Sequence, residues 1–147
     1  MKFVYDDGGR QAAGYKGKTG DCFVRAVAIA TGLPYQEVYD LTNKFAKDEK
    51  TSKRRRGSSN ARTGVHTVTA HKIFAELGWC WTPTMFVGSG CKVHVKADEL
   101  PSGRIVCNLS RHFAAVIDGE LHDTEDCSRE ETRCVYGYWA EGDNGKV

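Results

Sequence analysis

Apolar positions recur at two different spacings along the chain, which divides it into a helical first half and a strand-rich second half. Apolar residues fill nearly all of 22–31, so this segment is expected to form a central buried helix. Helical spacing of apolar residues also marks 34–45 and 67–77. Gly32 and Gly78 follow the first and third of these segments, where glycine commonly ends a helix.

Alternating or continuous apolar runs predict strands in the second half of the chain. These runs occupy 79–86, 92–95, 104–109, 112–124 and 134–139. Pro83 cannot donate to a sheet ladder, so the first run is expected at an edge of the sheet or with a break at this residue. Helices followed by strands are typical of an α+β fold. We expect one domain over 1–147, with a helical half (about 20–78) packed on an antiparallel sheet (about 79–139).

The run 112–124 reads as a β-hairpin, and its register has a chemical consequence. Asp118-Gly119 is the dipeptide that a two-residue type I′ turn favours. With that turn, Ile117 faces Glu120, and His112 and Asp123 lie on one sheet face as diagonal neighbours. A carboxylate at Asp123 could therefore orient the His112 imidazole and stabilise its protonated form.

A cysteine stands at the start of the predicted central helix. Thr19 or Asp21 could cap this helix, and its N-terminus favours negative charge on Cys22. Such a position can lower a thiol pKa and produce a nucleophile. Taken singly, His112 and Asp123 would more often be structural residues. Together with Cys22, however, they match a catalytic site in which a histidine activates a thiol nucleophile and an acidic residue orients the histidine.

This order of residues resembles the papain-like cysteine peptidases. The stretches "GDCFVRAVAIATG" (20–32) and "RHFAAVIDGELHDT" (111–124) are most similar to the compact bacterial branch that includes the bacteriocin-leader peptidases. The resemblance implies a papain-like fold with Cys22 as nucleophile, His112 as general base and acid, and Asp123 as its orienting partner. Most of the chain also resembles small proteins encoded by tailed phages and prophages.

The sequence departs from the papain-like pattern before the cysteine. The family usually has a Gln there whose amide stabilises the oxyanion, whereas this chain has Lys16 six residues before Cys22. Lys16, Lys18 or the Thr19 hydroxyl could replace that amide, together with the backbone N–H of Cys22. Arg25 occupies the place of a tryptophan that is common in the family.

The composition leads to expectations about the location of the protein and the redox state of its cysteines. The chain has no run approaching the roughly 18 apolar residues of a membrane span and no signal-type segment at its start, so a cytoplasmic site is expected, in the host cell if a phage encodes it. The six cysteines are then expected as thiols. Of these, Cys80, Cys91 and Cys107 read as small buried hydrophobes, while Cys127 and Cys134 could pair or bind metal. No cofactor and no structural metal site are expected.

A basic segment separates the second and third predicted helices. Residues 47–64 carry seven Lys or Arg against two acidic residues, and they include Arg54, Arg55 and Arg56. Without apolar periodicity, this segment is expected to be a long mobile loop. It could be simply solvated, cover the cleft, or bind nucleic acid or an acidic substrate.

Three functions follow from these features. The first is a thiol hydrolase that cleaves a peptide or isopeptide bond of a protein substrate through a Cys22 acyl-enzyme. The second is a catalytically inactive module with the same fold that binds a host macromolecule. The third is nucleic-acid binding through the basic segment.

Overall fold

Three helices form where the apolar spacing predicts them. The computed structural model describes residues 1–17, 19–49 and 57–142. Helix α1 spans Cys22–Thr31, α2 spans Tyr35–Ala46 and α3 spans Thr67–Glu76. Gly32 ends α1 in the left-handed conformation, with φ of 77°, that glycine adopts without steric cost.

The strands form one mixed sheet of six, so the fold class is α+β. They are β1 (Phe3–Tyr5), β2 (Trp79–Pro83), β3 (Arg104–Leu109), β4 (His112–Ile117), β5 (Glu120–Asp123) and β6 (Gly137–Glu141). Their order across the sheet is β1-β5-β4-β3-β6-β2, which places Pro83 in an edge strand as predicted. The expectation of a purely antiparallel sheet is wrong, because β1 joins the other edge parallel to β5.

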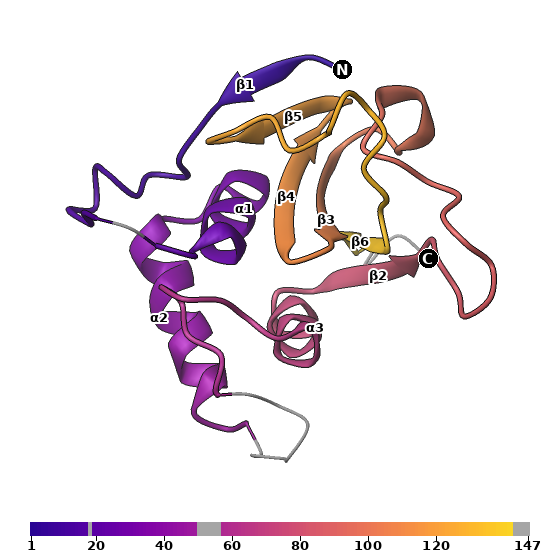
Figure 1. Ribbon diagram of the computed structural model, residues 1–147. Coiled ribbons are helices and arrows are strands. Elements are labelled where there is room, and N and C mark those ends of the chain that lie inside the picture. Colours follow the sequence, from indigo (N-terminus) through magenta and orange to yellow (C-terminus); the bar gives the residue numbers. More distant parts are fainter. Residues whose placement is uncertain (18, 50–56, 143–147) are drawn as a thin grey trace.

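Helices cover one face of this sheet, and irregular chain covers the other (Figure 1). Between helices and sheet, Phe23, Phe74, Phe113 and Trp139 form the centre of the larger core. The opposite face carries Val116 and Leu121 with other buried apolar residues, under the segments 93–100 and 127–135. The sheet is therefore buried on both faces, and α1 lies against β4.

The predicted hairpin register is present in β4 and β5. Ile117 pairs with Glu120, and Ala115 with His122. Asp118 and Gly119 both have positive φ, 49° and 77°, as a type I′ turn requires. This register places the side chains of His112 and Asp123 on the same face.

The sequence expectations for three cysteines and for a strand at 92–95 are wrong. Cys91 and Cys134 form a disulfide, so they are not free thiols, and Cys134 does not pair with Cys127. Residues 92–95 form no strand and make only an isolated bridge between His94 and Cys134. Cys80 is exposed rather than buried, because it lies on the edge strand β2, and Cys91 is exposed because it lies in irregular chain outside the sheet. Cys107 is buried as predicted.

The second part of the basic segment is well packed, contrary to the expectation of a mobile loop throughout. Ala61 is buried in the larger core, and its N–H donates to the Asn43 side chain. The Gly20 N–H donates to the Arg62 carbonyl at 2.7 Å, which ties this segment to the start of α1. Residues Lys18, Arg54, Arg55 and Arg56 lie outside the described residues. No helix in the described part of the chain is long and apolar enough to cross a membrane.

Candidate functional site

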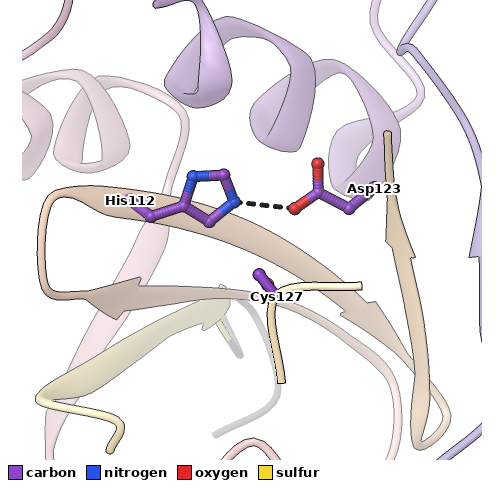
Figure 2. A group of neighbouring side chains, drawn as sticks. All are labelled: His112, Asp123 and Cys127. Atoms are coloured by element: carbon purple, nitrogen blue, oxygen red, sulfur yellow. Dashed lines mark hydrogen bonds and ion pairs between the residues drawn. The ribbon is translucent and has the colours of Figure 1, made fainter. Parts of the chain in front are cut away.

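The hairpin brings His112 and Asp123 into direct contact. The His112 Nε2 lies 2.7 Å from the Asp123 Oδ2. Figure 2 shows the two side chains pointing toward each other across this hydrogen bond. Asp123 is only 4% exposed, and its other oxygen accepts the Thr124 N–H at 2.7 Å and lies 3.6 Å from the Arg25 guanidinium. Because Asp123 occupies Nε2, the His112 Nδ1 is left to exchange a proton with a thiol.

Cys22 opens α1 at the rim of a pocket of about 380 Å³ that His112 also lines. The thiol is half-buried rather than sealed in the core. One wall is formed by residues 63–65, and the other by the ends of β3 and β4. Asp21 holds the N-cap position of α1 but makes no side-chain cap. No side chain within 1–17, 19–49 or 57–142 accepts a hydrogen bond from the first backbone N–H groups of this helix, and these groups can stabilise negative charge near Cys22.

The electrostatics of the pair favour the charged forms of both partners. Burial alone would lower the pKa of His112, but the hydrogen bond to Asp123 and the nearby thiols of Cys127 and Cys22 raise it to about 11. Burial would raise the pKa of Asp123, but His112, the Thr124 N–H and Arg25 hold it below its usual value. The site therefore holds an imidazolium–carboxylate pair at neutral pH.

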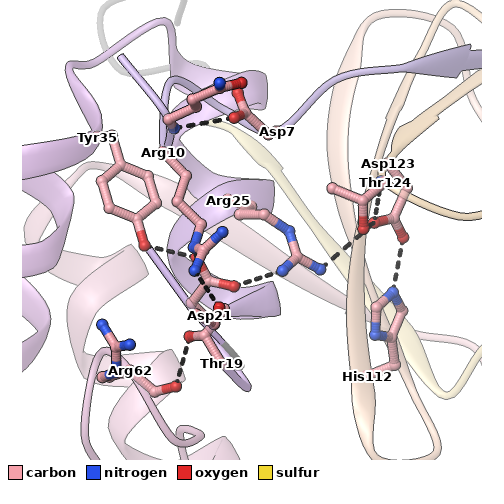
Figure 3. A network of polar contacts seen from close by, with 12 residues as sticks. Asp7, Arg10, Thr19, Asp21, Arg25, Tyr35, Arg62, His112, Asp123 and Thr124 are labelled. Carbon is pink, nitrogen blue, oxygen red and sulfur yellow. Dashed lines mark hydrogen bonds and ion pairs between the residues drawn. The ribbon is translucent and has the colours of Figure 1, made fainter. Parts of the chain in front are cut away.

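A buried polar network connects this pair to the start of α1 (Figure 3). Arg25, one turn into α1, bonds to Asp21 and reaches Asp123. Asp21 is 1% exposed and also accepts from the Tyr35 hydroxyl, while the Arg10 Nε lies 3.5 Å away. Burial and the Asp21 carboxylate raise the pKa of Tyr35, so it remains a donor. The network fixes the helix that carries Cys22 relative to the strand that carries Asp123.

The described candidates for the oxyanion site lie in different places. Thr19 lines the Cys22 pocket, but its hydroxyl donates to the Arg62 carbonyl at 2.8 Å. Lys16 lines a separate pocket with Tyr15 and Arg10, so the structure does not bring it to the thiol. The position of Lys18 is not described.

Asn108 is a site residue that the sequence reasoning missed. It lies on β3 opposite Phe113, is 8% exposed, and lines the Cys22 pocket. Its side chain makes no hydrogen bond to another described residue, so the amide is free to meet a substrate. The sequence does contain an indication of this role: Asn108 is a single amide side chain within the apolar run 104–109, and an amide is unusual in a core strand. Arg111, with φ of 55°, lines the same pocket.

A second thiol borders the other side of the site. Cys127 lines a neighbouring pocket of about 730 Å³ together with His112 and Asp123. In the described residues, the donor atoms of His112, Asp123 and Cys127 lie within 4.8 Å of one another, so they are the group that could hold a metal ion.

Comparison with known proteins does not assign the chain to a family. No protein-family model matches the chain, and neither the curated proteins nor the solved structures contain a match.

Proposed function

We propose that the protein is a papain-like thiol hydrolase. The observation that carries this proposal is the 2.7 Å contact between His112 and a buried Asp123, beside a pocket that also contains the half-buried thiol of Cys22. An imidazole with one nitrogen held by a carboxylate and the other free toward a thiol is the arrangement that acyl transfer needs.

The proposed reaction has two steps. The Cys22 thiolate attacks the scissile carbonyl carbon, and the His112 imidazolium gives its proton to the leaving nitrogen as the C–N bond breaks. His112 then removes a proton from water, whose oxygen attacks the thioester; the C–S bond breaks, and the carboxylic acid leaves while the Cys22 thiolate and the His112 imidazolium are restored. The Asn108 amide and the N–H groups at the start of α1 are placed to bind the oxyanion in place of the missing glutamine.

The two pockets beside His112 suggest how a substrate would lie. One contains Cys22 and the other contains Asp123 and Cys127, and both share His112, Arg25, Arg111 and Thr19. A chain that crosses His112 would place residues on both sides of the scissile bond, which fits a peptide or isopeptide substrate. If a phage encodes this enzyme, its expected location is the cytoplasm of the host cell.

Competitive alkylation at neutral pH tests this function without knowledge of the substrate. Iodoacetamide is added in limiting amount to the metal-free protein, and peptide mass spectrometry measures the rate at each cysteine. We expect Cys22 to react at least tenfold faster than Cys80, which is exposed and lines neither of the two pockets that His112 lines. His112→Ala should lower the Cys22 rate and leave that of Cys80 unchanged.

Equal rates at Cys22 and Cys80 would refute the hydrolase and favour the inactive binding module. The absence of the family's glutamine is the observation that favours this second candidate. In that case Cys22→Ala should retain the biological function. Nucleic-acid binding by Arg54, Arg55 and Arg56 stays a prediction, because these residues lie outside the described part of the chain.

A further inference from the structure

Two thiols flank one imidazole, each from its own pocket. Cys22 lines the first pocket and Cys127 lines the second, whereas His112 lines both. Cys127 lies on the segment between β5 and β6, close to Asp123 (Figure 2). The thiol hydrolase reaction needs only one of these sulfurs, so Cys127 has no part in it.

We propose that His112, Asp123 and Cys127 form a Zn²⁺ site whose occupation switches off the Cys22 centre. The metal site stands on its own donors, whereas the switching rests on the proposed hydrolase function. One imidazole, one thiolate and one carboxylate are all donors that zinc takes, and three protein ligands leave a fourth position open.

The distances fit such a site after a small movement. Zinc lies about 2.0–2.3 Å from N, O and S ligands, so donors at the corners of a tetrahedron are roughly 3.2–3.8 Å apart. The three donor atoms here lie within 4.8 Å of one another. His112 and Asp123 are held by the hairpin, but Cys127 lies in a turn outside the sheet. To hold zinc, the 2.7 Å contact between His112 and Asp123 has to open by about 0.5 Å and Cys127 has to move inward by about 1 Å.

The surroundings of Asp123 already orient it for a ligand. Its Oδ1 is occupied by the Thr124 N–H and by Arg25, which leaves Oδ2 to face His112 and the second pocket. Fixed outer contacts of this kind are usual for carboxylates that bind metal. On binding, the Cys127 thiol proton and the proton between His112 and Asp123 pass to solvent. Thiolate and carboxylate then balance the two charges of the ion.

Occupation of this site would stop the proposed hydrolysis. The ion would hold the imidazole and the carboxylate that Cys22 requires, so His112 could neither take the thiol proton nor return it to a leaving group. The inhibition should be reversible by a chelator, because no covalent bond to Cys22 forms.

Metal titration of the full chain tests the site. Co²⁺ serves as the spectroscopic probe, and Zn²⁺ then competes with it. We expect one equivalent of Co²⁺ with a thiolate-to-cobalt charge-transfer band in the wild type and in Cys22→Ser. Cys127→Ser should lose the band and bind Zn²⁺ at least about 100-fold more weakly. Cys80→Ser, which removes an exposed thiol elsewhere, should bind as the wild type does.

A second measurement needs no variant. Zn²⁺ should protect Cys127 of the wild type from alkylation, and a chelator should restore its reactivity. The absence of a charge-transfer band, or equal Zn²⁺ affinity of Cys127→Ser, would overturn the metal site. Because Cys22→Ser retains the three donors, its metal binding is independent of the hydrolase. Conversely, Cys22 reactivity in excess chelator tests the hydrolase alone.

Discussion

Replacing Asp123 by Asn removes the buried charge next to His112 while it keeps the shape of the side chain. The amide oxygen can still accept the Thr124 N–H, which is 2.7 Å from Asp123 Oδ1. What is lost is the charge that holds the imidazolium and the Arg25 guanidinium. The substitution therefore isolates the electrostatic part of the pair.

The size of the effect follows from the pKa of His112. A rise from 6.5 to about 11 sets a ceiling of roughly 6 kcal/mol at 1.36 kcal/mol per pH unit. The thiols of Cys127 and Cys22 supply part of that shift, and the His112 side chain is 19% exposed, so solvent weakens the interaction. A hydrogen bond between charged groups typically contributes about 1.5–3 kcal/mol. We therefore expect Asp123→Asn to lower the free energy of unfolding by about 3 kcal/mol.

The effect should depend on pH in a defined direction. A raised histidine pKa contributes stability that is complete below the unfolded value of 6.5 and is lost as pH rises toward 11. The lowered pKa of Asp123 contributes stability above the unfolded value of 3.8 that is lost as pH falls below it. The charged groups beside His112 are Asp123 from β5 and Arg25 from α1, and the thiols of Cys22 and Cys127 lie on either side of it. The variant should differ most from the wild type between about pH 4 and 6.5.

Urea unfolding at pH 5.5 and pH 9, with excess chelator, measures this difference. Glu120→Gln is the matched control, because Glu120 lies on the same strand and its exposed carboxylate is 3.4 Å from Lys2 and 3.8 Å from His122. Such a surface pair is expected to contribute at most about 0.5 kcal/mol. A loss of less than 1 kcal/mol for Asp123→Asn at pH 5.5, or the same loss at both pH values, would refute the reasoning.

Three further predictions concern the pocket and the cross-link. Asn108→Ala should slow acyl transfer from an activated ester about 10²–10³-fold with little change in KM, as steady-state kinetics would show, whereas an unchanged kcat would exclude Asn108 from the oxyanion site. Gly20→Ala places a Cβ 2.9 Å from the Thr63 carbonyl oxygen, so it should lower the free energy of unfolding by about 1–3 kcal/mol, as urea unfolding would show, and should slow Cys22 alkylation. Wild-type stability together with a wild-type alkylation rate would contradict this contact. Cys91→Ser removes a cross-link between residues 43 apart in the sequence, and a loop of that length predicts a loss of about 4 kcal/mol in the free energy of unfolding. Urea unfolding measures this loss with Cys80→Ser as the control, and equal stability of the two variants would count against the disulfide.

Local pattern was enough to predict the helices and the hairpin. The nearly continuous apolar run over 22–31 and the Asp118-Gly119 turn are decided by interactions close in sequence. The hairpin register then predicted that His112 and Asp123 meet, because side chains alternate strictly along a strand.

Features that depend on distant parts of the chain were missed. Strand β1 has only three residues, and its parallel partner β5 lies more than 100 residues later, so no local pattern marks the pair. The Cys91–Cys134 bond joins two irregular segments that spacing alone does not relate. Likewise, Asn108 joins the site only because β3 pairs with β4 beneath the start of α1.

Capture of an acyl-enzyme tests the central claim most directly. The metal-free protein is mixed with a nitrophenyl ester, quenched in acid, and mapped by mass spectrometry. The account predicts an initial burst of nitrophenol and an acyl group on Cys22, with both greatly reduced in His112→Ala. An acyl group spread over Cys22, Cys80 and Cys127 alike, or no dependence on His112, would contradict it.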